Sequence, residues 1–338
     1  MIDLRSAYAG KRALVTGGLG CLGSSLTLEL VALGCDVTIV DNHFHMFGAN
    51  EHNVVTVRDR VNVNVCDIRD ADAMNHLVKG QDVLFHIGMQ TSHVDSMTDP
   101  FWDIDVNCRG NMVVYEAVRH HNPECHVVYA GTRGQYGVLE EIPVGEKHRM
   151  QPTDIYGVNK VAAEGYGFVY HRAYGIPFTS LRVNNCYGPR HQMRHAKYGI
   201  LNWFIRLAMD GETIKLYGDG GQKRDYNYVD DAVRAFLLAG AHRDTCNGEA
   251  YNLGSGKART LREATELVIE YANSGSLEFV PWPDDRKAIE TGDYFADFSK
   301  FTAATGWKPE IEMEDGLART VQFYAEHKDH YWTPGVVG

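Results

Sequence analysis

Two side chains that could move a proton together, Tyr156 and Lys160, stand four residues apart. The preceding Gln151-Pro-Thr-Asp154 favours a helix start, because proline fits the first turn and threonine or aspartate can cap it. On that helix the phenol and the ammonium share one face. A free tyrosine titrates at about pH 10 and is a poor base at neutrality, but a nearby ammonium favours the phenolate. The pair predicts a general base; an exposed Tyr–Lys stack is the alternative.

A third side chain, Thr132, lies just past a β-branched run at residues 126–129 that predicts a strand. That position is the carboxyl edge of a sheet, where ligands of α/β proteins bind. Its hydroxyl could hydrogen-bond the reacting oxygen of a substrate. We therefore predict a catalytic group of Thr132, Tyr156 and Lys160.

A glycine-rich loop, Thr16-Gly-Gly-Leu-Gly-Cys-Leu-Gly23, directly follows a predicted strand at residues 12–16. Its glycines permit a tight turn, close backbone approach to a pyrophosphate and close packing of the next helix. The N-terminus of that helix would direct free N–H groups at the phosphates. An ordinary strand-to-helix turn is the alternative. The loop predicts cofactor contacts from Gly17, Gly20, Cys21, Leu22 and Gly23.

A carboxylate at the end of the second predicted strand indicates which dinucleotide is bound. Asp41 lies where the chain would place an acceptor for the ribose hydroxyls. Its charge would repel a 2′-phosphate, so NAD is expected rather than NADP. Asn42 lies beside it, and Asp67, after the third strand, is placed to meet the adenine edge. The alternatives are a turn formed by Asp41 and Asn42 and a solvated turn at Asp67.

The elements that must hold these residues alternate between strand and helix. Alternation of this kind implies parallel βαβ units, so the predicted fold class is α/β, a Rossmann-type doubly wound parallel sheet. The strands are predicted at residues 12–16, 36–40, 61–65, 82–86, 126–129 and 177–182. We expect an NAD-binding domain at residues 1–183 and a smaller C-terminal substrate-binding lobe at 184–338, with segments near 225–252 returning to the first. That lobe should contain helices at residues 261–272 and 313–327, and the tail from Pro334 to Gly338 should be loosely ordered.

The composition limits the remaining possibilities. The net charge of −11 argues against nucleic-acid or membrane-surface binding, since no basic face is implied. No apolar run suggests a spanning helix, and the start lacks the pattern of a signal peptide. The seven cysteines have no Cys-x-x-Cys spacing, and the histidines match no ligand set, so we expect reduced thiols, no metal and a cytoplasmic protein.

In their order and spacing, three features resemble the extended short-chain dehydrogenase/reductase family: the glycine loop, the carboxylates Asp41 and Asp67, and the group of Thr132, Tyr156 and Lys160. Within it the chain is most similar to the NAD-dependent nucleotide-sugar epimerases and dehydratases, of the UDP-glucose 4-epimerase type. The resemblance covers nearly the whole chain. It also includes Phe85-His-Ile-Gly88, Tyr136-Gly137 and residues 181–190, 224–231, 251–256 and 303–309.

The resemblance implies further site residues and a homodimer. Additional cofactor contacts are implied at Ile68, Gly88 and Asn107. Asn185, Arg224 and Arg286 would hold the nucleoside diphosphate, since arginine forks match phosphate geometry; salt bridges are the alternative for the two arginines. The segment around Arg286 departs from the usual family pattern. His93 and Arg190 are further candidate substrate contacts, and Arg194 is a weaker one.

The type of reaction depends on the two residues after Thr132. Dehydratases of the family have Asp-Glu there to move protons, whereas this chain has Arg133-Gly134, which favours 4-epimerisation. Tyr156 would take the proton from the 4-hydroxyl while carbon 4 gives a hydride to NAD, and Gly134 would leave room for the 4-keto sugar to turn over. Arg133 could bind a substrate carboxylate, which would make the sugar a uronic acid, or form a salt bridge with an acidic neighbour, which we favour.

Two other functions fit the same fold. A nucleotide-sugar reductase or dehydrogenase would share the catalytic group but consume free cofactor. A non-catalytic NAD-binding sensor would usually lack the Tyr or the Lys, and both are present. A 4,6-dehydratase is the further alternative within the family.

Overall fold

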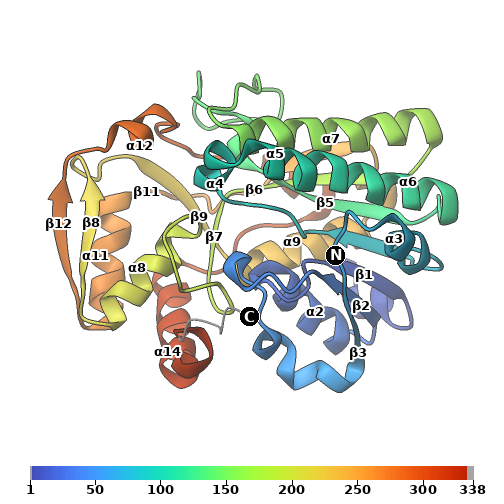
Figure 1. Ribbon diagram of the computed structural model, residues 1–338, viewed down its shortest axis with the longest axis horizontal. Helices are drawn as coiled ribbons and strands as arrows, with labels where there is room; N and C mark the ends of the chain where they lie inside the picture. The colour runs from blue at the N-terminus through green and yellow to red at the C-terminus, as the bar shows by residue number, and fades with distance from the viewer. Residues whose placement is uncertain (1, 333–338) are drawn as a thin grey trace.

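A seven-stranded parallel sheet forms the centre of the computed structural model, which describes residues 2–332 (Figure 1). The order of strands is β10-β6-β5-β4-β1-β2-β3, so the chain winds outward from β1 in both directions. This confirms the predicted Rossmann-type α/β class. The strands are β1 Arg12–Thr16, β2 Asp36–Asp41, β3 Val61–Val65, β4 Val83–His86, β5 His126–Thr132, β6 Phe178–Val183 and β10 Glu249–Asn252.

The strand predictions agree closely with the structure because the strands are short β-branched runs buried on both faces. β1 and β3 have the predicted bounds, β2 and β4 differ by one residue at one end, and β6 is shifted by one residue at both ends. β5 is the exception, since it continues three residues further than predicted. Thr132 is therefore the last residue of this strand, whereas the sequence placed it just past the strand.

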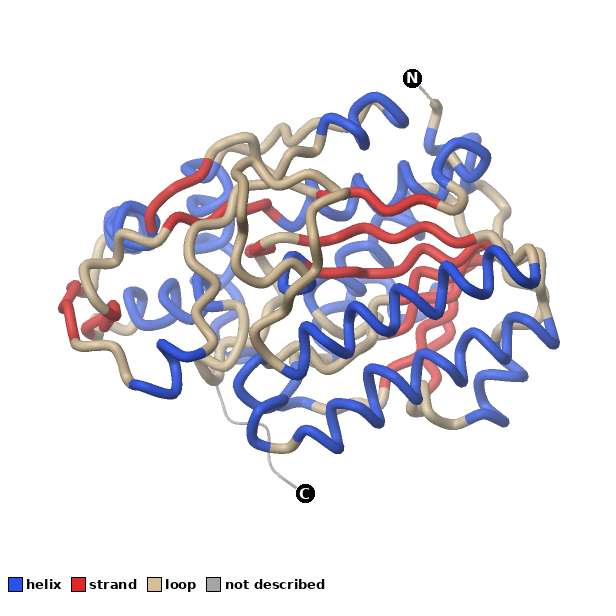
Figure 2. Tube along the Cα trace, turned by 90° about the horizontal axis from the view of Figure 1, so that it is seen from above, coloured by secondary structure: helices blue, strands red, loops and turns tan. Residues whose placement is uncertain are grey.

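Helices cover both faces of the main sheet, as Figures 1 and 2 show. One face packs against α2 and α9, whose apolar core is continuous with the core of the smaller lobe. The other packs against α3, α6 and α7 around a second core. These helices are α2 Cys21–Ala32, α3 Ala71–Leu77, α6 Asn111–His121, α7 Ile155–Tyr174 and α9 Val229–Ala241.

The smaller lobe contains two small sheets and three main helices. Its three-stranded sheet has the order β11-β9-β7, and β8 pairs with β12 in parallel. Thus β9 belongs to the smaller lobe, whereas β10 pairs with β6 in the main sheet. The elements are β7 Asn185–Tyr187, β8 Thr213–Tyr217, β9 Lys223–Tyr228, β11 Ala258–Thr260, β12 Ser276–Val280, α8 Ile200–Met209, α11 Leu261–Ala272 and α14 Met313–Tyr331.

The predicted C-terminal helices are both present. α11 has the predicted bounds, and α14 continues to Tyr331 past non-helical dihedral angles at His327, where the prediction ended. The tail from Pro334 to Gly338 lies outside the described residues. Within residues 2–332, no helix combines the length and apolar character that crossing a membrane requires.

Short elements connect the main ones. Several of them, notably α4, η4 and α12, carry candidate site residues. They are α1 Leu4–Tyr8, η1 His45–Phe47, η2 Glu51–Arg60, α4 His93–Thr98, α5 Pro100–Ile104, η3 Asp105–Gly110, η4 Arg133–Gln135, α10 Arg243–Cys246, α12 Asp284–Ala288 and α13 Ser299–Thr305.

Candidate active site

A cavity of about 460 Å³ lies across the carboxyl ends of the main strands and reaches the first strands of the smaller lobe. This is where parallel α/β sheets bind ligands. Of the predicted site residues, the structure brings sixteen to its walls: Gly17, Gly20, Cys21, Leu22, Gly23, Asp41, Asn42, Asp67, Ile68, Gly88, His93, Thr132, Arg133, Tyr156, Lys160 and Asn185.

The glycine loop forms one end of the cavity. Gly17 has a φ of +68°, and a Cβ there would lie 2.6 Å from the Cα of Gly88. A Cβ on Gly23 would lie 2.1 Å from the carbonyl oxygen of Gly17. α2 begins after Gly20 without a side-chain cap, so the first-turn N–H groups remain available to an anion. The loop thus has the shape and the donors that a pyrophosphate needs.

The acidic rim lies at the ends of β2 and β3. Asp41 is buried, and its two carboxylate oxygens accept hydrogen bonds of 3.0 Å from the backbone N–H groups of Leu19 and His43. Asn42 donates to Asp67 at 3.0 Å. Burial raises the pKa of Asp67, but hydrogen bonds from Arg69 outweigh it and leave that pKa lowered. Hydrogen bonds from neighbouring groups thus orient both carboxylates at the wall of the cavity.

The three predicted catalytic side chains meet in the middle of the cavity. Asp154 caps α7 by accepting from the N–H of Gly157 at 2.7 Å, which places Tyr156 in the first turn of the helix. Burial raises the pKa of Tyr156, while a hydrogen bond with Thr132 acts in the opposite direction. The phenol therefore needs added positive charge before it can act as a base near neutrality.

Lys160 lies one turn along α7 from Tyr156. Its ammonium donates to the carbonyl oxygen of Ala130 at 2.6 Å and lies 4.3 Å from the centre of the Tyr129 ring. Burial lowers the pKa of Lys160 to about 7, although Glu164 counteracts this in part. When protonated, this lysine would favour the phenolate form of a neighbouring tyrosine.

His93 forms a dyad with Asp154 beside the catalytic tyrosine. Its Nδ1 lies 2.5 Å from a carboxylate oxygen of Asp154, and its ring packs edge-on against Tyr156, 4.8 Å between centroids. Gly134 makes room for this ring, since a Cβ at that position would lie 3.1 Å from Cε1 of His93. The dyad places a second titratable group against the reacting end of the cavity.

Arg133 lines the same end of the cavity, and the salt bridge favoured for it from the sequence is not formed. Its polar contact within residues 2–332 is a long one of 3.4 Å from Nη1 to the hydroxyl of Thr291. Its guanidinium carbon lies 5.4 Å from the centre of the Tyr294 ring. Burial and the charge of Arg224 together lower the pKa of Arg133 to about 10.

Four predicted binding residues do not reach the cavity wall. Arg224 is buried and forms an ion pair with Glu290, the salt-bridge alternative for this residue. Arg190 donates to the hydroxyl of Ser25 at 2.9 Å, on α2. The other two are Arg286, which is paired with its neighbour Asp285, and Asn107, which lies behind the wall and donates to the carbonyl of Gln90.

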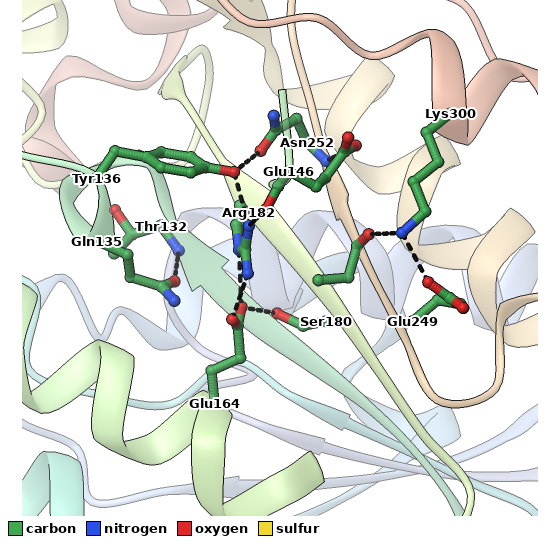
Figure 3. Close-up of polar contacts among 11 residues, drawn as sticks. Thr132, Gln135, Tyr136, Glu146, Glu164, Ser180, Arg182, Glu249, Asn252 and Lys300 are labelled. Carbon is green, nitrogen blue, oxygen red and sulfur yellow. Dashed lines mark hydrogen bonds and ion pairs between the residues drawn. The ribbon is translucent and has the colours of Figure 1, made fainter. Parts of the chain in front are cut away.

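A buried ion pair supports the strand and turn that carry Thr132 (Figure 3). Arg182 on β6 donates to both carboxylate oxygens of Glu164 on α7, at 2.6 and 3.0 Å, and to the hydroxyl of Tyr136 at 2.7 Å. Tyr136 follows η4, whose capping box joins the N–H of Thr132 to Gln135 at 2.8 Å. The network therefore links β6, α7 and the turn after β5 behind the catalytic group.

Comparison with known proteins identifies the family. The model of the NAD dependent epimerase/dehydratase family matches residues 13–254. The chain belongs to this family. Like its other members, it uses NAD as cofactor, and the glycine cradle and the buried Asp41 carboxylate fit that dinucleotide.

Its relatives in the family have different activities. The chain is 32% identical to the UDP-glucose 4-epimerase of Mycolicibacterium smegmatis, over 93% of this chain and 98% of that protein. It is 30% identical to the dTDP-glucose 4,6-dehydratase of Streptomyces griseus, over 95% and 96%. The structure of the epimerase Mth375 of Methanothermobacter thermautotrophicus superimposes with a TM-score of 0.90 at 28% identity, covering 97% of this chain and 96% of that one.

Sequence reasoning missed part of the cavity wall. Phe44, Phe47 and Trp102 line the cavity together, and the rings of Phe47 and Trp102 lie 4.9 Å apart. They come from irregular or short segments, so no periodic pattern could have indicated them. Tyr226 also lines the cavity; it lies in a family motif, but nothing in its spacing assigned it a role.

Proposed function

We propose that this protein is an NAD-dependent nucleotide-sugar 4-epimerase that acts through a transient 4-keto sugar. One observation carries the proposal: Thr132, Tyr156 and Lys160 line one cavity, and no carboxylate follows Thr132, where Arg133 and Gly134 stand instead. Epimerisation at carbon 4 needs a single proton-transfer group for the 4-hydroxyl, whereas loss of water needs an additional acid and base.

The residues of the chain divide the work as follows. Thr132 hydrogen-bonds Tyr156 and is positioned to hold the 4-oxygen, while Tyr156 takes its proton and later returns it. Lys160, with a pKa of about 7, supplies adjustable positive charge near the phenol. The glycine loop and Asp41 would hold NAD, which would supply hydride transfer at carbon 4 and, through its oxidised ring, positive charge that favours the Tyr156 phenolate.

Binding is assigned to the two ends of the cavity. NAD would be held by the glycine loop together with five other residues that line the cavity: Asp41, Asn42, Asp67, Ile68 and Gly88. Asn185 and His93 would contact the nucleotide sugar. Arg224 would have to exchange Glu290 for a phosphate to take part, since its fork is occupied in this conformation.

One specific observation supports a second candidate, a 4,6-dehydratase. The His93–Asp154 dyad lies against Tyr156 and offers a general acid or base that the residues after Thr132 do not. In that reaction His93 would move the proton that accompanies loss of water from the 4-keto sugar.

Incubating the purified protein with a panel of nucleotide sugars, without added cofactor, distinguishes the two reactions. A new isomer of unchanged mass, detected by mass spectrometry and proton NMR, is expected for the epimerase. A product lighter by one water would replace this proposal with the dehydratase. Tyr156→Phe should abolish turnover while NAD binding remains, and full activity in that variant would refute the assigned base.

We also propose that the protein is a homodimer that associates through α5 and α7. These helices lie next to each other, and Figure 1 shows them on one side of the molecule with α4. They expose apolar side chains: Phe101 is 81% exposed and Ile104 44%, and Val158 on α7 is 49% exposed. A cluster of this kind favours burial against a second copy.

A further inference from the structure

Arg133 carries a charge that the protein does not neutralise. Within the described residues its guanidinium forms no ion pair; its neighbours are the hydroxyl of Thr291, the ring of Tyr294 and a second guanidinium, that of Arg224. The carboxylates of Glu290 and Asp154 act on it only from beyond ion-pair distance, and each is engaged elsewhere, by Arg224 and by His93. Arg133 is partly buried. A partly buried cation without a close counter-charge loses some of its hydration, and that cost is recovered when a ligand brings the negative charge. Because the side chain lines the cavity, a bound ligand can reach it.

A second group at the same place lacks a partner. The hydroxyl of Tyr226, on β9, is buried and has no hydrogen-bond partner within residues 2–332. The residue is 5% exposed and lines the same cavity as Arg133, whose charge acts on its hydroxyl and lowers the pKa of Tyr226 against the larger, raising effect of burial. A buried hydroxyl without a partner is unusual in a folded protein and is expected to be satisfied by a ligand. Tyr226 and Arg133 together offer a hydroxyl and a forked cation.

The position along the chain indicates which part of the substrate meets this pair. Arg133 directly follows Thr132, whose hydroxyl bonds that of Tyr156, so it lies at the reacting end of the cavity. The nearest other cation, Arg224, is already engaged by Glu290 and by the carbonyl oxygen of Gly292 at 2.6 Å. An anion meeting Arg133 is therefore a substituent of the sugar.

We propose that Arg133 and Tyr226 form a subsite for a carboxylate on the sugar, so that the substrate is a nucleotide-activated acidic sugar such as a uronic acid. This inference rests on the proposed nucleotide-sugar function and names the class of sugar. A carboxylate matches the guanidinium fork with two parallel hydrogen bonds and leaves the Tyr226 hydroxyl to donate a third. A neutral hydroxymethyl group would leave the charge of Arg133 unpaired.

Calorimetric binding to the NAD-loaded protein tests the subsite with three probes: UDP, UDP-glucose and UDP-glucuronate. The wild-type protein should bind UDP-glucuronate about tenfold or more tightly than UDP-glucose, because a charge-assisted bidentate contact is gained. Arg133→Met should remove this preference and leave the affinity for UDP unchanged. Arg133→Lys should restore part of it, and Tyr226→Phe should reduce it.

Arg262→Met is a matched control, since Arg262 lies on α11 in an exposed pair with Glu266. It should keep the wild-type preference. The ligand-free Arg133→Met protein should melt at or above the wild-type temperature, because an unpaired charge is removed. A lower melting temperature would show that Arg133 is a structural contact and would overturn the subsite.

Two further results would overturn it. The first is equal affinity of the wild-type protein for the two sugars; the second is a loss of affinity for all three probes in Arg133→Met, which would assign Arg133 to the diphosphate. The experiments also distinguish failure of the subsite from failure of the proposed epimerase function. Interconversion of neutral sugars without preference for an acid keeps the epimerase and removes the subsite, whereas preferential binding of the acid without any isomer formed keeps the subsite and removes the epimerase.

Discussion

The buried ion pair between Arg182 and Glu164 offers a quantitative test of how the site is supported. Both side chains are almost fully buried, at 4% and 3% exposure. Burial lowers the pKa of Arg182, but the hydrogen bonds and charge of Glu164 more than compensate and leave it raised. Removing one member of such a pair costs about 3–5 kcal/mol, because the other charge is left buried alone. At about 2.1 cal/mol/K per residue, 338 residues have an unfolding entropy of about 0.7 kcal/mol/K, so the melting temperature should fall by about 4–7 °C.

The assay is a double-mutant cycle of Glu164→Gln, Arg182→Met and the double variant, followed by thermal and urea unfolding. Each single variant should lose stability by the amount above. The double variant should lose less than the sum, by about 2 kcal/mol or more, because neither charge remains unpaired.

The exposed pair of Arg319 and Asp315 provides the control. It has a similar distance of 2.6 Å, but its side chains are 48% and 50% exposed, so Arg319→Met should cost less than about 1 kcal/mol. If the Glu164 and Arg182 variants cost no more than this control, or if their effects add, the pair does not hold β6 to α7 and the reasoning is refuted.

Two other predictions concern acid stability and assembly. Burial and the charge of Arg243 together lower the pKa of His126 to about 4, and its Nε2 lies 2.9 Å from the Thr179 hydroxyl. Since an unfolded histidine titrates at about 6.5, only the unfolded state binds this proton between those values, and stability must fall as pH drops from about 6.5 to about 4. His126→Asn should make that fall shallower by up to about 3 kcal/mol in urea unfolding series, and an unchanged slope would contradict the assignment. If the proposed homodimer forms, Phe101→Glu should convert it to a monomer in light scattering while NAD binding is kept, whereas a wild-type monomer would refute the α5–α7 interface.

Local sequence patterns predicted the strands of the main sheet, the glycine loop and the pairing of Tyr156 with Lys160. Strand positions depend on runs of β-branched residues, and the glycine loop depends on backbone conformations that only glycine adopts easily, as the φ of +68° at Gly17 shows. Tyr156 and Lys160 share a helix face because they are four residues apart. Each of these features is set by neighbours within a few positions along the chain.

Such local patterns could not predict which charged side chains far apart in the sequence form ion pairs. From the sequence, Arg133 and Arg224 were both open to a salt bridge, yet only Arg224 has its carboxylate, Glu290, 66 residues away along the chain. His93 and Asp154 meet across 61 residues. Which acid a given base meets depends on how segments far apart along the chain come together in the fold, and no periodic signal encodes that.

The sequence by itself determined the parallel α/β frame, the dinucleotide loop and the Tyr–Lys pair. These features depend on local backbone preferences and on the periodic spacing of apolar residues, and both are properties of residues close together in the chain. Only the tertiary structure decided that Arg224 is neutralised while Arg133 is not, that Asn107 lies behind the wall, and that His93 fills the space beside Gly134. Those outcomes depend on burial and on distances between segments brought together by folding, which determine where an unpaired charge can remain for a ligand.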